Sequence, residues 1–306
     1  MENDLKKYRF GIVALIGPPN AGKSTFLNQV IGEKVAIVTS KPQTTRNQIT
    51  GILTDDSMQI IFLDTPGIHE HGGRMNDMMV RSAWSGLHAA DLVFFMLDAV
   101  QYVKKPGRLK FDLNMFSKRM VSLASPVIIG LNKVDMLEDK KSLLPVMQAV
   151  QKEMDACEIF PLSASKGEGV AEIIERFRSA LPAGEALYPS DQLSTLSLKF
   201  MASEIIREKL FLNLHRELPY NLAVSLETWD EDDQLVRMEA TILVSRSSHK
   251  PIVIGKKGEK LKQVGSQARR ELEDLLGKKV FLNLWVKIKP KWNENPSLLS
   301  SLGLEG

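Results

Sequence analysis

The sequence is short of the features that mark secreted and membrane-spanning proteins. Its 306 residues include a single cysteine, Cys157, so no disulfide can form within the chain, which fits a reducing compartment. No apolar run reaches the roughly 20 residues that a membrane-spanning helix needs. The first ten residues also lack the apolar core of a signal peptide. We therefore expect a cytoplasmic protein, and 306 residues suggest about two domains.

The charge of the chain is small in total but unevenly distributed. The formal net charge is +3. Residues 227–233 contain five acids and no base, whereas residues 246–291 contain thirteen bases against four acids. Such an excess favours a polyanionic partner, nucleic acid first and anionic lipid second. A solvated charged face is the simpler alternative.

One short stretch matches the phosphate-binding pattern of two glycines followed by Lys and Ser. An apolar run at 10–16 precedes it and predicts a buried strand, and the apolar spacing at 24–31 predicts a helix. Backbone N–H groups of such a loop and the positive end of the helix can bind phosphates, with Lys23 at the β- and γ-phosphates and Ser24 on Mg²⁺. The expected phosphate-binding residues are Gly17, Pro18, Pro19, Asn20, Ala21, Gly22, Lys23 and Ser24.

A second apolar run, 58–63, predicts a buried strand that ends in Asp64, Thr65, Pro66 and Gly67. A carboxylate at this edge can hold Mg²⁺ through its water shell, and the Gly67 N–H can reach a γ-phosphate. Strands and helices then alternate to residue 181, which predicts an α/β fold with a mainly parallel sheet flanked by helices. We expect the polar stretch 39–47 to be an exposed loop.

A third motif, Asn132-Lys133-Val134-Asp135, indicates which base is bound. The Asp135 carboxylate can accept hydrogen bonds from guanine N1–H and from its 2-amino group, and adenine offers neither donor. Asn132 can hold the loops together, and the stem of Lys133 can lie over the ring. The following loop, Ser163, Ala164 and Ser165, suits a backbone N–H to guanine O6.

Together with Gln43-Thr44-Thr45-Arg46, these motifs resemble those of the Era family of translation-factor-class GTPases. The resemblance implies that Thr45, or Thr44 if the register differs by one, closes on Mg²⁺ and the γ-phosphate. The metal ligands would then be Ser24, Thr45 and Asp64. A P-loop small-molecule kinase is the rival enzyme class, and the guanine-reading motif argues against it.

The expected catalytic set is Lys23, Thr45, Gly67 and Asn20. Ile68 follows Gly67 in the nucleotide site, where Ras-like enzymes carry a glutamine that orients water, so we expect slow turnover. In GTPases that resemble this one, an asparagine at the position of Asn20 helps to seat K⁺. The alternative is that Asn20 only tolerates a left-handed turn.

The chain after residue 198 resembles a type II KH domain, in the order helix, strand, strand, helix, Gly-Lys-Lys-Gly, helix, strand. We expect a GTP-binding domain at 1–182, a linker at 183–198 and an RNA-binding domain at 199–306. An apolar floor for bases is expected from Ile252, Ile254, Leu261 and Val264, although these residues could equally belong to the core. The expected RNA-binding residues are Ile252, Ile254, Gly255, Lys256, Lys257, Gly258, Lys260, Lys262, Arg269 and Arg270.

The resemblance implies a GTP-hydrolysing switch that binds 16S rRNA and acts in maturation of the 30S subunit. It also implies weak peripheral association with the inner membrane, and we expect a monomer that does not bind DNA. Two rivals stay open: a regulatory GTPase that uses its basic domain on anionic lipid, and a protein that holds GTP without hydrolysing it.

Overall fold

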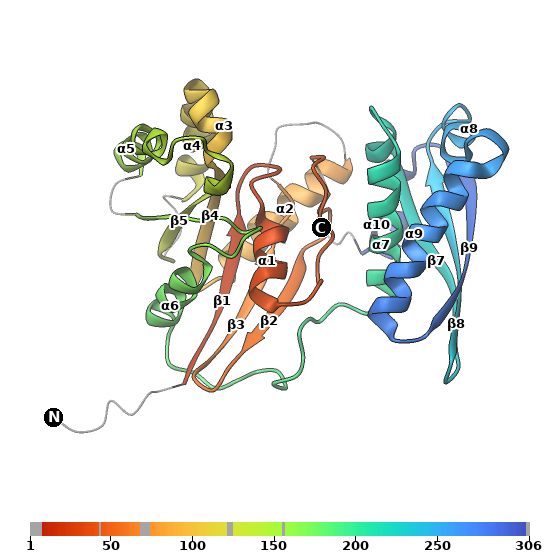
Figure 1. Ribbon diagram of the computed structural model, residues 1–306, viewed down its shortest axis with the longest axis horizontal. Coiled ribbons are helices and arrows are strands. Elements are labelled where there is room, and N and C mark those ends of the chain that lie inside the picture. The colour runs from red at the N-terminus through yellow and green to blue at the C-terminus, as the bar shows by residue number, and fades with distance from the viewer. Residues whose placement is uncertain (1–7, 43, 68–73, 121–124, 155–156, 304–306) are drawn as a thin grey trace. The chain divides into compact units, whose positions relative to one another are not determined.

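A computed structural model describes residues 8–42, 44–67, 74–120, 125–154 and 157–303 (Figure 1). The chain forms two compact units, which are described separately. The first consists of Met1–Ala36, Gln48–Glu70 and Val80–Thr195. The second consists of Ile37–Asn47, His71–Met79 and Leu196–Gly306.

The first unit is built on a six-stranded sheet in the order β2-β3-β1-β4-β5-β6. Only β2 and β3 pair in the antiparallel sense, and all other neighbours are parallel. This confirms the mainly parallel α/β sheet expected from the alternation of apolar runs and helices. The strands are β1 (Arg9–Ile16), β2 (Ile49–Thr54), β3 (Met58–Asp64), β4 (Leu92–Asp98), β5 (Val127–Asn132) and β6 (Glu158–Pro161).

Helices cover both faces of this sheet because alternate strand residues point to opposite sides. On one face Phe26 and Phe177, from α1 (Lys23–Ile31) and α6 (Val170–Ala180), pack against Phe94. On the other face the next strand residue, Phe95, packs against Phe116. That second face is covered by α2 (Arg74–His88), α3 (Ala99–Lys104), α4 (Pro106–Met120) and α5 (Leu143–Glu153).

Helix α3 was not expected from the sequence. It begins after Asp98, whose carboxylate accepts a hydrogen bond from the N–H of Gln101 at 3.0 Å. An aspartate at the N-cap satisfies one of the helix's unpaired donors, so the signal was present in the sequence. The Tyr102 ring is fully buried and anchors this short helix in the core.

The segment expected to be a linker lies along the first unit for most of its length. The buried side chain of Gln59 on β3 accepts hydrogen bonds from the N–H groups of Leu187 and Tyr188 and donates one to the Tyr188 carbonyl at 2.8 Å. Further along, the Ser194 hydroxyl donates to the Thr50 carbonyl on β2. The segment is therefore bound to β2 and β3 by hydrogen bonds between side chains and backbone groups.

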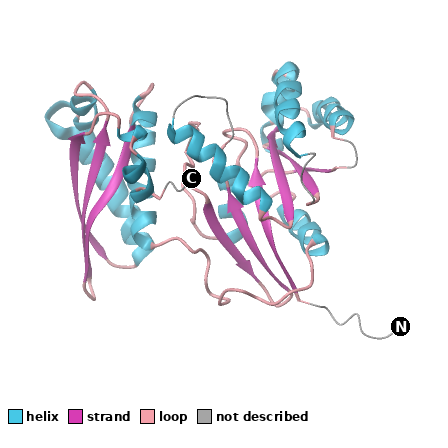
Figure 2. Cartoon of the chain, turned by 180° about the vertical axis from the view of Figure 1, so that it is seen from behind, coloured by secondary structure: helices cyan, strands magenta, loops and turns pink. Residues whose placement is uncertain are grey.

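The second unit carries a three-stranded sheet, β7 (Leu222–Glu231), β8 (Leu235–Val244) and β9 (Lys279–Ile288), in that order. Strands β7 and β8 are antiparallel and β8 and β9 are parallel. Helices α7 (Leu198–Asn213) and α9 (Glu259–Leu276) pack on one face of this sheet, and α8 (His249–Ile254) leads into the Gly-Lys-Lys-Gly loop (Figure 2). This agrees with the KH-type order expected from the sequence.

The tail of the chain, from which the sequence indicated nothing, contributes to the packing of the second unit. Trp292 is 1% exposed and lies in a cluster with Leu299 from α10 (Pro296–Ser301). The same cluster includes Ala223 and Leu243 from β7 and β8. Alternation along these strands places both residues on the sheet face opposite α7 and α9.

The expectation that 39–47 forms an exposed loop is wrong for its last residues. Arg46 is 4% exposed within the second unit. Its guanidinium donates to the carbonyls of Leu222 at 2.7 Å and of Pro219 and Tyr220 at 3.1 Å each. Just before this stretch, the Val38 N–H donates to the Glu208 carboxylate at 2.9 Å. The Arg46 guanidinium thus finds its partners in backbone carbonyls that are distant in the sequence, whereas the sequence alone predicts that it contacts solvent.

Candidate nucleotide site and nucleic-acid-facing loop

The predicted phosphate-binding loop connects β1 to α1 and depends on two glycines with positive φ. Gly17 has a φ of 148°, and a Cβ there would lie 2.2 Å from the Met96 carbonyl oxygen. Gly22 has a φ of 100°, and a Cβ there would lie 2.1 Å from the Asn132 side-chain nitrogen. The loop is therefore packed against the ends of β4 and β5, and only glycine fits at both points.

Lys23 begins α1 directly after this loop and is only 6% exposed. Its ammonium donates to the carbonyls of Gly17 and Pro18 at 3.1 and 3.2 Å. Burial lowers the pKa of Lys23 to about 8, and the negative charge of Asp64 opposes this effect. Phosphate oxygens beside this ammonium would stabilise its charged form.

We expect nucleotide binding to take up a proton at Lys23. With a pKa of about 8 in the free protein and a higher pKa beside phosphates, GDP binding at pH 8 should take up about half a proton. The affinity should fall as the pH rises above 8, since the bound form needs the charged lysine. Calorimetry in two buffers of different ionisation enthalpy measures the uptake. Lys23→Arg stays protonated and should take up none; the same uptake in both proteins would contradict the assignment.

Ser24 and Asp64 form the expected magnesium-binding pair. The Ser24 hydroxyl donates to the fully buried Asp64 carboxylate at 2.5 Å. A hydroxyl and a carboxylate are the hard oxygen donors that Mg²⁺ prefers. Within the described ranges no group of three His, Cys, Asp or Glu side chains gathers at one point. The residues therefore fit an ion held by one or two protein oxygens together with phosphate oxygens and water.

The chain after Asp64 is held against the same loop. The Thr65 hydroxyl donates to the Leu15 carbonyl at 2.8 Å and fixes the end of β3 beside β1. A Cβ on Gly67, the residue after Pro66, would lie 2.9 Å from the Pro19 Cα, so Gly67 packs directly against the predicted phosphate-binding loop. Ile68, the next predicted nucleotide-site residue, lies outside the described residues, as does Gln43.

The side chain of Asn132 joins the phosphate-binding loop to the loops expected to bind the base. Its nitrogen donates to the Ala21 carbonyl at 2.8 Å. Its oxygen accepts from the N–H groups of Ala164 at 2.9 Å and of Lys133 at 2.8 Å. This residue at the end of β5 therefore connects its own motif to two other predicted motifs, and it is only 2% exposed.

The residues predicted to read the base follow this asparagine in the sequence or bond to it. Asp135 is exposed, in a short 3₁₀ turn (Val134–Met136). Ser163 is fully buried, and its hydroxyl lies 3.2 Å from that of Ser165. Lys133 has a φ of 68°, and its ammonium lies 2.6 Å from the Asp98 carboxylate, which pairs in register with Asn132. Sequence reasoning missed Asp98, although an acid at the end of a buried strand was a usable signal.

Two predicted residues stay undecided by this geometry. Asn20 has a φ of 62°, the left-handed conformation that its alternative interpretation requires, and its role toward K⁺ stays a prediction. Thr44 and Thr45 belong to the second unit, where the Thr44 hydroxyl donates to the Lys41 carbonyl at 2.7 Å. The placement of Thr45 on Mg²⁺ stays a prediction as well.

The Gly-Lys-Lys-Gly loop of the second unit turns sharply between α8 and α9. Gly255 and Gly258 have φ values of 77° and 79°, and Lys257 has a φ of 51°. A Cβ on Gly255 would lie 2.7 Å from the Lys260 Cβ, whereas Gly258 has open space around it. An approaching phosphate backbone can therefore come close to Gly258.

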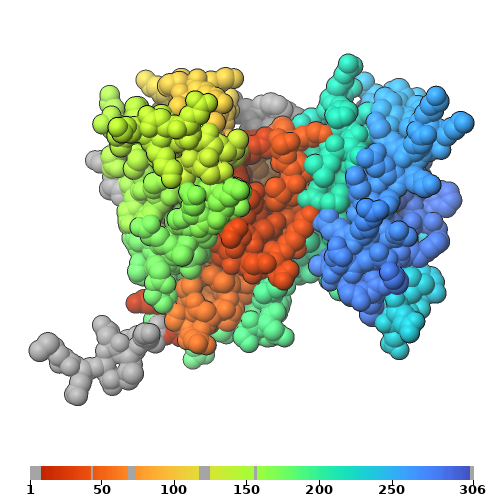
Figure 3. Space-filling view, viewed as in Figure 1, coloured from red at the N-terminus to blue at the C-terminus, as the bar shows by residue number. Residues whose placement is uncertain are grey.

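Most predicted RNA-binding side chains of this region are accessible. Helix α9 lies on the face of the second unit that Figure 3 presents. Ile252 is 47% exposed, whereas Val264 is completely buried in the core. The expectation that Val264 supports bases is therefore wrong, because its side chain packs between α9 and the sheet. The exposed basic side chains are those of Lys256, Lys257, Lys262, Arg269 and Arg270, and that of Lys260 is partly exposed.

Known proteins match both halves of the chain. Residues 12–133 match the family model described as a 50S ribosome-binding GTPase, and residues 217–293 match the KH domain model. The chain is 51% identical over 300 residues to the GTPase Era of Nitratidesulfovibrio vulgaris, covering 97% of this chain and 98% of that protein. It is 46% identical over 299 residues to the GTPase Era of Desulfovibrio desulfuricans, covering 97% of each.

Solved structures match over a similar length. A tyrosine-to-alanine variant of Aquifex aeolicus Era bound to GDP and AlF₄⁻ superposes with a TM-score of 0.92 at 37% identity, covering 97% of this chain and 100% of that one. An Era complex with MgGDPNP and nucleotides 1506–1542 of 16S ribosomal RNA gives the same TM-score and identity over 98% of this chain and 100% of that one. The resemblance carried by the nucleotide motifs is thereby confirmed, and the chain belongs to the Era family of GTPases.

Proposed function

We propose that this protein is a GTP-hydrolysing switch that binds 16S rRNA and acts in maturation of the 30S subunit. The observation that carries the proposal is the Asn132 junction, which joins a phosphate-binding loop to a guanine-reading loop, in a chain that also presents a basic Gly-Lys-Lys-Gly loop. The Era protein solved with a 16S rRNA fragment and MgGDPNP shares 37% of its residues with this chain, which supports the same partners here.

The proposed division of labour follows the motifs. By its motifs, the GTP-binding domain spans 1–182, the linker 183–198 and the RNA-binding domain 199–306, although the compact units assign 37–47, with Thr45, to the second unit and 183–195 to the first. In the first domain Lys23 and Gly67 would bind the γ-phosphate, and Ser24, Asp64 and Thr45 would hold Mg²⁺. In the second, Ile252, Ile254 and the loop glycines would receive single-stranded bases and their backbone.

Replacing Gly258 with aspartate should weaken RNA binding about tenfold or more. The change adds a side chain and a negative charge where we place the phosphate backbone. Binding of the GTP-loaded protein to a 16S 3′-end fragment, followed by crosslinking, measures the effect. Gly277→Asp is the matched control, because Gly277 also has a positive φ (64°) and open space but ends α9 at its other end. Equal losses in both variants would remove the loop from the RNA interface.

The same proteins test the choice of partner. The proposal requires the wild type to sediment with 30S rather than 50S subunits, and Gly258→Asp to lose this association. The rival is a regulatory GTPase that uses the basic surface on anionic lipid, and it requires binding to anionic vesicles that competes with the RNA fragment. Over the described ranges, no helix is long and apolar enough to cross a bilayer. We propose a monomeric cytoplasmic protein with weak peripheral membrane association and no affinity for DNA.

We expect GTP turnover to be several-fold faster in K⁺ than in Na⁺ if Asn20 helps to seat the larger ion near the β–γ bridge. A cation there would stabilise charge that develops in the transition state. The variant Asn20→Gly retains a residue that tolerates a φ of 62° and removes the side-chain amide. It should keep its GTP affinity and lose the ion preference. Equal wild-type turnover in the two salts would show that Asn20 serves only the turn.

A further inference from the structure

The second unit contains a cavity of about 320 Å³ whose lining includes no residue of the phosphate-binding loop, the base-reading motifs or the Gly-Lys-Lys-Gly loop, although Arg46 belongs to the predicted motif at 43–46. Its walls come from α7, the first half of β7, Trp292, the chain at 300–303, and Arg46 with Asn47. All of these belong to the second unit. A cavity of this size is at the small end of the range for small-molecule sites.

Three buried side chains in the lining each carry a polar atom with no hydrogen-bond partner among the described residues. They are Nε of Arg46, Nη1 of Arg207 and Oδ1 of Asn47. The three residues are 4%, 3% and 9% exposed, so bulk water does not solvate them fully. Nε of Arg46 and Nη1 of Arg207 are donors, whereas Oδ1 of Asn47 is an acceptor. Buried donors left unpaired cost free energy, so the arginine side of the cavity suits an occupant that accepts hydrogen bonds.

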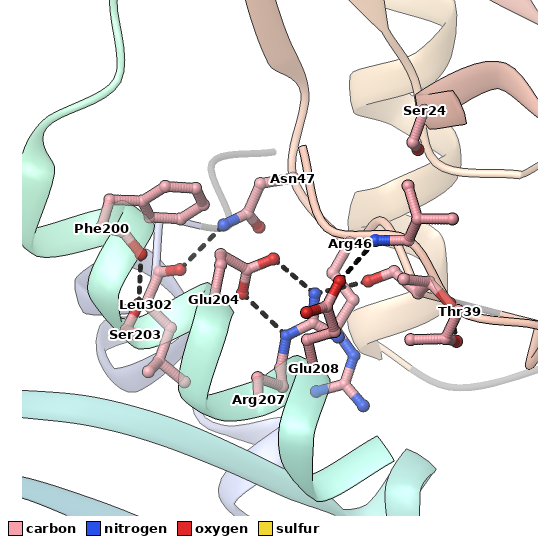
Figure 4. Close-up of polar contacts among 12 residues, drawn as sticks. Ser24, Thr39, Arg46, Asn47, Phe200, Ser203, Glu204, Arg207, Glu208 and Leu302 are labelled. Carbon is pink, nitrogen blue, oxygen red and sulfur yellow. Dashed lines mark hydrogen bonds and ion pairs between the residues drawn. The ribbon is translucent and has the colours of Figure 1, made fainter. Parts of the chain in front are cut away.

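The other atoms of these side chains are already committed. Both terminal nitrogens of Arg46 donate hydrogen bonds to backbone carbonyls. The Arg207 guanidinium pairs with Glu204, at 2.7 Å from Nε, and also donates to the Thr44 carbonyl (Figure 4). The unpaired donors are therefore fixed in place by the bonds of their neighbours rather than free to turn elsewhere.

The charge of the lining is positive. Arg46, Lys199 and Arg207 are opposed only by Glu204. Burial, followed by the positive charge of Arg207, lowers the pKa of Arg46, so two cations are held close together in a poorly solvated place. An anion between them would relieve this repulsion.

The rest of the lining is apolar or carries hydroxyl groups. Phe200, Leu226, Trp292 and Leu302 supply the apolar part, and serines from α7, β7 and α10 surround it. We propose that this cavity binds a small organic anion, with one carboxylate or phosphate group on the arginine side and an apolar body against the aromatic side. Guanidinium groups bind both kinds of oxyanion well.

The test uses the full-length protein saturated with GDP and Mg²⁺, so that the nucleotide site is filled. Benzoate and phenyl phosphate are the two charged probes, and benzamide is the neutral probe of matched shape. Binding is measured by calorimetry and by the shift in Tm. We expect at least one charged probe to bind at least tenfold more tightly than benzamide and to raise Tm, with the better probe telling carboxylate from phosphate.

Two variants locate the binding. Lys199→Gln changes an exposed residue at the rim and should weaken binding of the charged probe several-fold. Lys279 is an exposed lysine on β9, and Lys279→Gln should leave this binding unchanged. Ser225→Phe fills the cavity and should abolish binding while GDP affinity, checked on the same sample, stays unchanged. Equal affinity for benzamide, no binding of either charged probe, or full binding by Ser225→Phe would each overturn the proposal and leave the cavity to water.

Discussion

Replacing Gly22 with alanine is expected to reduce the affinity for GTP and GDP by a factor of about 100 or more. The new Cβ would lie 2.1 Å from the Asn132 side-chain nitrogen, at a backbone φ of 100° that alanine rarely adopts. The loop must move to relieve this close contact. That movement would withdraw backbone N–H groups from the phosphates and break the hydrogen bond between Asn132 and the Ala21 carbonyl. Titration with a fluorescent GDP analogue measures the loss.

Gly32→Ala separates this effect from backbone strain. Gly32 follows α1 and has a φ of 80°, and a Cβ at this position would lie in open space. Alanine there should lower the free energy of unfolding by about 1 kcal/mol and leave nucleotide affinity within about twofold. If Gly22→Ala binds GDP as well as Gly32→Ala does, the close approach between the two loops has no part in binding.

The second large effect is expected from Asp135→Asn. The change replaces one carboxylate oxygen, which accepts from guanine, with an amide nitrogen that donates. Two hydrogen bonds to a charged acceptor are each worth about 1.5–3 kcal/mol, so GTP affinity should fall by about 100-fold or more. Xanthine presents a carbonyl where guanine has its 2-amino group, so the variant should gain affinity for xanthosine triphosphate.

The gain in affinity for xanthosine triphosphate is the stronger part of this test, because a misfolded variant would lose affinity for every nucleotide. Glu138→Gln, three residues further on and also exposed, provides the charge-matched control and should bind both nucleotides as the wild type does. Competition between GTP, xanthosine triphosphate and ATP on one sample gives all three affinities. A wild-type protein that prefers ATP would remove the role of Asp135 altogether.

Much of the first unit could be predicted because its strands are apolar over their full length. A strand buried on both faces of a parallel sheet must be apolar throughout, so runs such as 10–16 and 58–63 are easy to recognise. The residues directly after such strands then lie at one edge of the sheet, which is why Asp64 and Asn132 could be assigned from the sequence. Element bounds differed by only a few residues.

The contacts that could not be predicted are those between residues far apart in the sequence. The Arg46 guanidinium reaches carbonyls more than 170 positions away, and nothing in a polar stretch signals that a distant turn will pair with it. The prediction that Val264 supports nucleobases was wrong for a related reason. On a helix, apolar residues facing the core and those facing a ligand have the same spacing, so periodicity alone cannot separate them.

The single asparagine that ties the phosphate-binding loop to the base-reading loops has an energetic consequence. Ordering either loop also orders the other, so the entropy lost on immobilising both is incurred once when an intact nucleotide binds. A nucleoside or a bare triphosphate would incur nearly the same loss for only part of the contacts. Guanosine or triphosphate alone should therefore bind far more weakly than its separate contacts suggest, so the site discriminates against fragments of its own substrate.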